Sequence, residues 1–397
     1  MISQKGMTLI EVMVSLVVIL IVISGASIAY LKLLKAFKTQ SKISESYVEN
    51  LSGRELLRYD IEMAGYGLPC ALNSSTYTEA ASSESIVPNP NSFNDATAGI
   101  PRAFAFSNNG ATGANNSDVL VIKSQRVNIN STSKKWSLIY YDGATSKWRV
   151  KQWNDASMDL GSNERFIVMD KGRILQNNAG VWQFSFNTGY FTDVESVIPH
   201  LPHPPTPALP TDPIDIYLIY GIDPDTNLQM PFNRADYYLA KPPNDSDFPT
   251  RCYNVDNDHH SYILYRSTIN QGNGVRNPQP LLDCVMDFQV AFGLDTDGDR
   301  NVDTWTDDLN TIVDTDGNGT ADEIRQFVRQ IAVSILYHEG KKDDDFQFSG
   351  SLTLGNLPAS GLIPAVPALS TYTPVGDAVN YRWKLMNLTI KPMNFSE

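Results

Sequence analysis

The N-terminal part of the chain carries a helical pattern of apolar positions. Residues 12–31 contain no charged side chain, and most are Val, Ile, Leu, Met or Ala. About 20 such residues are enough for a helix to cross a bilayer. Beyond them, apolar side chains recur at helical spacing, with a change of phase near residues 52–53: Ile43, Tyr47 and Leu51, then Leu57, Ile61 and Ala64. The pattern predicts a helix from Met7 to about Met63, ended by the Gly and Pro residues of 65–69.

From about residue 70 the pattern becomes that of strands. Runs rich in Val, Ile, Tyr, Phe and Trp alternate with turn residues at 118–127, 136–142, 148–153, 165–170, 181–187, 214–222, 262–269 and 287–294. This predicts an α+β protein, in which a long N-terminal helix with a membrane half and an amphipathic half precedes a large antiparallel β-rich globular domain.

Other segments of this domain have different patterns. One more helix is expected at 321–329, directly before a strand at 330–337. Segments rich in Pro, Ser, Asn, Ala or Gly are expected to be loops: 73–116, 198–213 and 354–376. A change of lobe near 198–213 is left open.

Composition excludes several classes of protein. The net charge of −13 argues against a nucleic-acid binder, which needs a basic face. The cysteines at 70, 252 and 284 form no CxxC pair, so a cysteine zinc site is not expected. GxSxG, Walker A, HExxH and Rossmann glycine motifs are absent from the sequence, which predicts a non-enzymatic protein. The histidines are expected at the surface: His200, His203, His259, His260 and His338.

The residues before the apolar run form a specific motif. Residues 5–11 read KGMTLIE. With the apolar run after it, this motif resembles the class III signal of type IV prepilins and pseudopilins. The resemblance implies cleavage after Gly6 by a prepilin peptidase, N-methylation of Met7, and pairing of Glu11 with the terminal amine of a neighbouring subunit. A carboxylate at membrane depth is costly and is by default a functional hypothesis. The alternative is that Glu11 lies at the level of the lipid headgroups.

A second resemblance begins where the helix should end. Residues 54–68 (RELLRYDIEMAGYGL) resemble the end of the stem in the PilW family of type IV minor pilins, with Asp60, Ala64, Gly65 and Tyr66 at the matching positions. Further pieces of the same resemblance follow in order at 117–122, 235–240, 262–267, 280–299, 328–337 and 382–394.

The resemblance implies a structural subunit that takes part in type IV pilus assembly. A domain this large is expected near the pilus tip, because it is bulky for a tightly stacked filament. We expect a leader peptide at 1–6, a transmembrane or filament-core helix at 7–30, an amphipathic stem helix at 31–69 and the β-rich domain at 70–397. The alternatives are a type II secretion pseudopilin and a calcium-dependent adhesin displayed on the pilus.

The resemblance also implies a location and partners. The chain would wait in the inner membrane with its domain in the periplasm, and would reach the pilus and the cell surface after assembly. Lysines after the apolar run favour the opposite topology, but long domains translocate largely regardless of charge. The expected partners are other pilins and minor pilins, prepilin peptidase and the inner membrane, with no nucleic acid.

Two acidic loops have the composition of cation sites. Each places oxygen-bearing residues at alternating positions: Asp295, Asp297, Asp299, Asn301 and Asp303, and Asp314, Asp316, Asn318, Thr320 and Asp322. Calcium takes six to eight oxygen ligands in flexible loops of this kind. Neither loop is a full EF-hand loop, because Thr306 and Arg325 replace the Glu at position 12. Arg300 occupies the sharp-turn position where the second loop has Gly319. Calcium is expected, with the second loop favoured; the alternative is a pair of solvated turns.

The cysteines suggest one disulfide. In an oxidising compartment Cys252 and Cys284 are expected to pair, closing a loop of about 31 residues and contributing roughly 3 kcal/mol. The alternative is two buried thiols, and a pair involving Cys70 is left open.

Overall fold

The computed structural model describes residues 8–81, 88–108, 114–178, 180–186, 197–199, 212–242, 244–255, 258–259, 261–315, 317 and 319–395. The chain divides into two compact units, Met1–Leu51 and Ser52–Glu397, and each is described by itself. Most of the Pro-rich segment 198–213 lies outside the described residues.

The first unit contains most of helix α1 (Leu9–Glu62). Its segment Leu9–Lys35 is long enough to cross a membrane, and the mean hydropathy of its most apolar 18 residues is 2.7. None of that window is buried in the unit, and Leu9 is 80% exposed. The predicted apolar helix is therefore confirmed. The side chains of Ile43 and Tyr47, on which the amphipathic pattern rests, lie outside the described part of the chain.

The second unit begins with the last turns of α1, which pack on a large sheet. Leu57 and Ile61 are fully buried and belong to the main hydrophobic core. A Cβ added to Gly53 would lie 2.8 Å from the carbonyl oxygen of Leu281, so only glycine allows the helix to approach the sheet this closely. This contact lies where the apolar pattern of the sequence changes phase.

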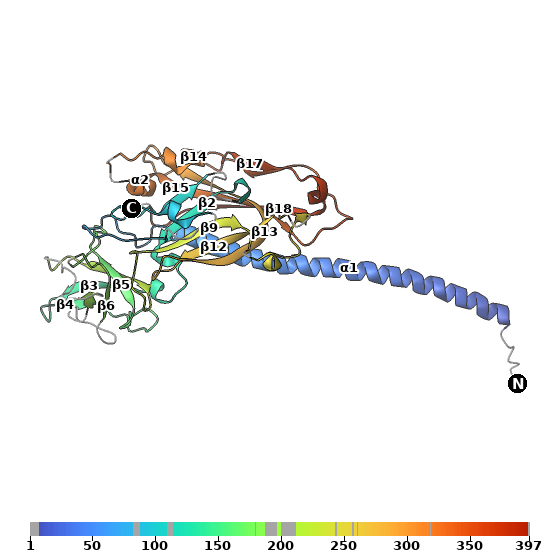
Figure 1. The fold of residues 1–397 in the computed structure, drawn as a ribbon, viewed down its shortest axis with the longest axis horizontal. Helices are drawn as coiled ribbons and strands as arrows, with labels where there is room; N and C mark the ends of the chain where they lie inside the picture. The colour runs from blue at the N-terminus through green and yellow to red at the C-terminus, as the bar shows by residue number, and fades with distance from the viewer. Residues whose placement is uncertain are drawn as a thin grey trace, which may run out of the picture. The chain divides into compact units, whose positions relative to one another are not determined.

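Within the described residues the larger sheet has eight antiparallel strands. Seven of them follow the order β1-β2-β9-β12-β13-β15-β18, and β14 pairs with the end of β13. Their bounds are β1 Phe104–Ser107, β2 Val119–Ser124, β9 Asn233–Ala240, β12 Tyr262–Ile269, β13 Arg276–Leu294, β14 Thr304–Thr306, β15 Val328–Glu339 and β18 Arg382–Ile390. Figure 1 shows β9, β12 and β13 side by side in this sheet.

Both faces of this sheet are covered. Leu120 and Ile122 of β2 join the main core that contains the end of α1, whereas Val119 and Val121 join a second cluster with Phe93 on the opposite face. Burial on both faces explains why β2 reads as a continuous apolar run and does not alternate.

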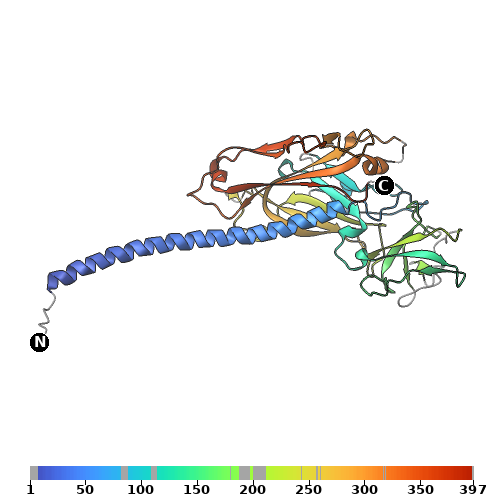
Figure 2. The same ribbon diagram turned by 180° about the vertical axis from the view of Figure 1, so that it is seen from behind.

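A second sheet, with six strands in the described part of the chain, is inserted between β2 and β9. Its order is β4-β3-β8-β5-β6-β7. The bounds are β3 Trp136–Asp142, β4 Lys147–Val150, β5 Arg165–Met169, β6 Phe184–Phe186, β7 Val197–Pro199 and β8 Tyr217–Asp223. It has its own core around Ile139, Phe166 and Ile219. Its green ribbons lie together, apart from the larger sheet, in both views (Figures 1 and 2).

The boundaries of this sheet decide the question of a change of lobe near 198–213, which the sequence left open. The chain leaves the larger sheet after residue 124 and returns at 233, so the change does not fall at 198–213. Strand pairing across long sequence distances decides this, and a local pattern carries no information about it.

Several other elements correct the expected loops. Segment 73–116 contains edge strand β1, and segment 354–376 contains most of the hairpin of β16 (Leu352–Gly355) and β17 (Ala368–Tyr372). Helix α2 is Ala321–Phe327 and β15 begins at Val328, so the expected helix and strand are both present with shifted bounds. A small ladder joins β10 (Asn254–Val255) to β11 (Asp258–His259).

Candidate functional site

The start of α1 is closed by a capping box. The backbone N–H and the hydroxyl of Thr8 donate to Glu11 Oε2 at 2.8 and 3.0 Å. In return, the Glu11 backbone N–H lies 3.4 Å from Thr8 Oγ1. Thr8 is thus the N-cap residue and Glu11 the third residue of the helix, as in the S/T-x-x-E pattern. The spacing of TLIE was the signal for this cap, and the sequence reading missed it.

The capping box gives Glu11 a local role in the isolated subunit. Glu11 is exposed, at the end of a helix whose apolar side chains are exposed as well. A surface of this kind needs lipid or other helices around it. The expected cleavage and methylation sites, Gly6 and Met7, lie outside the described residues.

Three sequence pieces singled out separately meet at one buried cluster. Asp60 of α1 accepts hydrogen bonds at 2.7 Å from Tyr237 Oη of β9 and from Arg266 Nε of β12. All three side chains are buried. Burial raises the pKa of Asp60, and the ion pair with Arg266 opposes this effect. The cluster fixes the end of the helix to two central strands of the sheet.

The Ala-Gly-Tyr piece forms the exit from the helix. Ala64 is fully buried. Gly65 has φ +75°, and a Cβ there would lie 2.7 Å from the ring of Phe395. Its N–H donates to the carbonyl of Lys123 on β2 at 3.0 Å. The position requires glycine for two reasons: the backbone is left-handed, and the Phe395 ring leaves no room for a side chain. This explains the glycine of the motif.

A second buried charge cluster was missed by the sequence reading. Lys123 Nζ lies 2.7 Å from Glu79 Oε1 and 2.6 Å from Asp95 Oδ2. Arg234 pairs with the other oxygen of Glu79 at 2.8 Å and with Asp236 at 2.7 Å. The available signal was Lys123 inside the apolar run VLVIKS, because a charge in a buried strand needs a partner.

The first acidic loop, residues 295–303, joins β13 to β14. Carboxylate oxygens of Asp295, Asp297 and Asp303 lie within 4.8 Å of one another. Asp299 instead accepts from the backbone and side-chain amides of Asn301, at 2.7 and 2.9 Å. The structure thus brings together three of the five expected ligands.

Hydrogen bonds order this loop. Asp295 is buried and accepts from the N–H groups of Gly298 and Arg300, at 2.7 and 3.0 Å. It also pairs with Arg329 of β15 at 3.0 Å. The backbone N–H of Thr296 donates to Asp303, and this bond is the main cause that lowers the pKa of Asp303.

The second acidic loop, residues 314–322, wraps its first carboxylate in the same way. Asp314 accepts from Gly317 and Gly319 at 2.7 and 3.0 Å. At the other end Asp322 turns to Arg325 at 3.1 Å. Two expected ligands, Asp316 and Asn318, lie outside the described residues. Within the described part of the chain, three gathered carboxylates occur in the first loop, whereas the sequence favoured the second.

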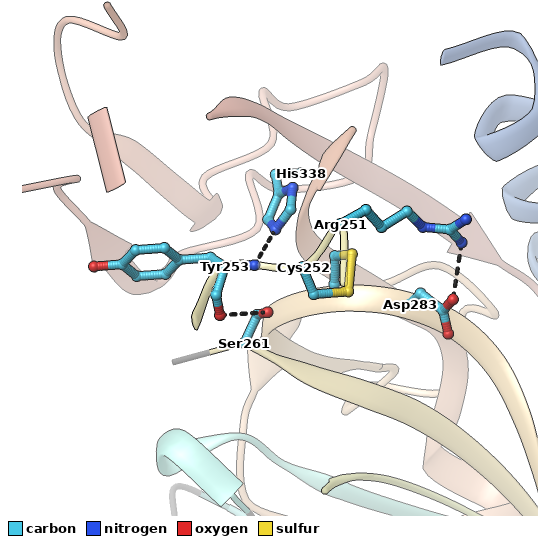
Figure 3. The surroundings of a disulfide bond; sticks show 7 residues. Arg251, Cys252, Tyr253, Ser261, Asp283 and His338 are labelled. Atoms are coloured by element: carbon cyan, nitrogen blue, oxygen red, sulfur yellow. Dashed lines mark hydrogen bonds and ion pairs between the residues drawn. A yellow bond between two sulfur atoms is a disulfide. The ribbon is translucent and has the colours of Figure 1, made fainter. Parts of the chain in front are cut away.

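Cys252 and Cys284 form a disulfide with an S–S distance of 2.05 Å. Cys284 has φ +57° and lies where the pairing of β13 with its neighbours changes register. Figure 3 shows Arg251 beside the bond, paired with Asp283 at 2.8 Å. The disulfide thus joins segment 251–253 to the irregular part of β13. Cys70 is a free thiol.

His338 corrects the expectation of surface histidines. It is 1% exposed on β15, and its Nε2 accepts the backbone N–H of Tyr253 at 2.9 Å (Figure 3). Its ring packs on Tyr381 and Trp383, with centroids 4.6 and 5.1 Å away. Burial, reinforced by Arg251, lowers the pKa of His338 to about 3. The histidine can be buried because its neutral ring accepts this hydrogen bond and packs against aromatic neighbours.

Two family models match the chain, one at its N-terminus and one in its C-terminal part. Residues 1–27 match the family model of the prokaryotic N-terminal methylation motif. Residues 252–393 match the model described as type IV pilus-assembly protein W. The second match begins at a cysteine of the disulfide and includes the central strands of the larger sheet. No curated protein and no solved structure matches the chain. The two family matches, together with an exposed apolar helix and an antiparallel β-rich domain, support a PilW-like minor pilin.

Proposed function

We propose that this PilW-like pilin is cleaved after Gly6, methylated on Met7 and built into a type IV pilus through its N-terminal helix. The observation that carries the proposal is the match of residues 1–27 to the methylation motif, which includes the start of a helix whose apolar side chains are exposed within their own unit. Pilin-family matches at both ends point to a structural, non-enzymatic subunit.

Glu11 would act in assembly. In the separate subunit its carboxylate accepts two hydrogen bonds from Thr8. The positive N-terminal amine of a neighbouring subunit would give this carboxylate a charged partner among apolar helices. An ion pair in such surroundings is favourable when its geometry is good and its remaining groups are hydrogen-bonded. The growing filament would then favour correctly placed neighbours.

The β-rich unit would face the periplasm before assembly and the outside afterwards. The disulfide between Cys252 and Cys284 supports this location, because such bonds persist in oxidising compartments. The size of the Ser52–Glu397 unit supports a place near the tip, since a bulky domain hinders tight helical stacking. The match to pilus-assembly protein W favours a pilus over a secretion pseudopilin.

The test of processing uses Gly6→Val. A β-branched side chain at the cleavage position should leave a full-length precursor in the membrane. Mass spectrometry of the wild-type N-terminus should find methylated Met7. A different mature N-terminus would contradict the proposal. As a control, the β-rich unit of the Gly6→Val protein should resist protease as well as that of the wild type, which shows that it folds normally.

We further propose that the first acidic loop holds a calcium ion. Support comes from the three gathered carboxylates of Asp295, Asp297 and Asp303 and from the preference of calcium for such oxygens. The positive ion would offset the mutual repulsion of these carboxylates and stiffen the turn between β13 and β14.

A further inference from the structure

A cavity of about 520 Å³ opens in the Ser52–Glu397 unit. It lies among the turn after β5, the first acidic loop, helix α2 and the last residues of the chain. Its volume falls in the range of small-molecule sites, roughly 300–1,000 Å³. Five cationic residues and one acidic residue, Asp322, line it; the cations are Lys171, Arg173, Arg300, Arg325 and Arg329. This is a basic cavity in a chain of net charge −13.

Three of the five cations have carboxylate partners. Lys171 lies 2.6 Å from Asp215, Arg325 lies 3.1 Å from Asp322, and Arg329 lies 3.0 Å from Asp295.

Arg173 and Arg300 have no ion-pair partner within the described residues. These two arginines are therefore the cations of the cavity that no described carboxylate neutralises by direct pairing. An anion entering the cavity would meet them.

The same two arginines have unusual backbones. Arg173 has φ +57° and Arg300 has φ +71°, in the left-handed region that favours glycine. Gly319 fills the equivalent position of the second acidic loop with φ +98°. Eight other non-glycine residues of the described chain share this region. At these two positions a change to glycine removes the charge without adding backbone strain.

The deeper arginines are held in fixed positions. The side chains of Arg325 and Arg329 are 10% and 11% exposed. Arg325 donates to the carbonyl oxygens of Pro69 and Pro101, at 3.1 and 3.2 Å, and to Cys70 Sγ at 3.1 Å. Because these two side chains are already ordered, they lose little conformational entropy when an anion binds.

We propose that this cavity binds a small molecule that carries a multivalent oxyanion, either a phosphate group or several carboxylates. Arg173 and Arg300 supply the unpaired charge, and Arg325 and Arg329 form the ordered base of the site. Guanidinium groups suit both kinds of ligand, because their planar donors match pairs of oxyanion oxygens. The site is independent of pilin processing. It shares Arg300, and the Asp295 partner of Arg329, with the first acidic loop, so its binding is tested without calcium.

The test uses the full-length chain in non-ionic detergent without calcium. Inorganic phosphate and citrate are titrated calorimetrically, each against sodium chloride of equal ionic strength. We expect saturable binding of at least one probe and a rise of several degrees in melting temperature at saturation. Tighter binding of phosphate assigns a phosphorylated ligand, and tighter binding of citrate assigns a polycarboxylate. Equal melting curves in phosphate, citrate and chloride overturn the proposal.

Arg173→Gly and Arg300→Gly separate binding from folding. Glycine relieves the strained backbone, so the ligand-free melting temperature should stay the same or rise. Affinity for the bound probe should fall about tenfold or more for each change, as expected for a lost charged hydrogen bond.

Arg300→Lys should recover part of this affinity and covers the case of a glycine variant that folds poorly. Arg149→Gln removes a cation of β4 that faces Asp142 at 3.6 Å, away from the cavity, and should bind as the wild type does. Wild-type affinity in both glycine variants, or an equal loss in Arg149→Gln, overturns the assignment.

Discussion

Asp60 Oδ2 lies 2.7 Å from Arg266 Nε, and each side chain is only 1% exposed. One residue belongs to the last turns of α1 and the other to the central strand β12, 206 positions later in the chain. Because Tyr237 donates to the same oxygen, the carboxylate joins the helix to two strands at once. This buried contact gives a physical role to three pieces of sequence that, taken singly, were weak signals.

Asp60→Ala should destabilise the β-rich unit by about 3–5 kcal/mol, because it leaves Arg266 buried without its charged partner. The midpoint of urea unfolding, followed by tryptophan fluorescence, measures the loss. The double change Asp60→Leu with Arg266→Met should recover most of it, since both buried charges are then gone. A double variant as unstable as Asp60→Ala would contradict the assignment of the loss to the orphaned charge.

Glu11→Gln should separate helix capping from assembly. Glutamine also completes a capping box, so α1 should begin at the same residue while the negative charge is lost. We expect pilus incorporation to fall as strongly in Glu11→Gln as in Glu11→Ala, measured by immunoblotting of sheared filaments. Thr8→Ala breaks the cap but keeps the carboxylate and should incorporate better than either. If Thr8→Ala fails and Glu11→Gln assembles normally, Glu11 acts as a cap alone.

Calcium should raise the melting temperature of the full-length chain. At one hundred times Kd the stabilisation is about 2.7 kcal/mol, enough for a shift of several degrees. Asp297→Asn with Asp303→Asn should remove most of this rise. Asp299→Asn is the matched control, because Asp299 lies in the same loop but outside the gathered group. Identical melting curves in chelator and in millimolar calcium would show that the loop is an ordinary acidic turn.

His338 should make stability fall in mild acid. Its pKa is about 3 in the folded chain, against about 6.5 when unfolded, so the unfolded state binds more protons between these values. Stability from this group is complete above pH 6.5 and is lost as the pH falls towards 3, with a slope of at most about 1.4 kcal/mol per pH unit.

The difference between wild type and His338→Gln isolates this effect. Burial raises the pKa of Asp60 and of Asp287, which contribute a pH dependence of opposite sign. Both proteins share these groups, so their contribution cancels in the difference. Urea midpoints between pH 7 and pH 4 should fall more steeply for the wild type. Parallel curves would mean that the histidine is not held neutral by the fold.

The local features of this protein were readable from its sequence. The apolar helix, the start of the β-rich domain and most central strands follow from short-range periodicity, because a helix or strand presents its apolar residues at a fixed spacing. The KGMTLIE motif likewise predicted the family that the comparison supports. Even the missed capping box of Thr8 and Glu11 was a local pattern, visible in four consecutive residues.

Tertiary structure decided what depends on distant partners. The insertion of a six-stranded sheet between β2 and β9 is a matter of strand pairing, which local alternation does not encode. His338 is buried because Tyr253, Tyr381 and Trp383 surround it, and Lys123 is buried because Glu79 and Asp95 meet it. Arg173 and Arg300 line one cavity only because the two sheets bring turns 127 residues apart to the same place. A sequence fixes which side chains need partners, but the choice among distant partners is made only when the whole chain packs.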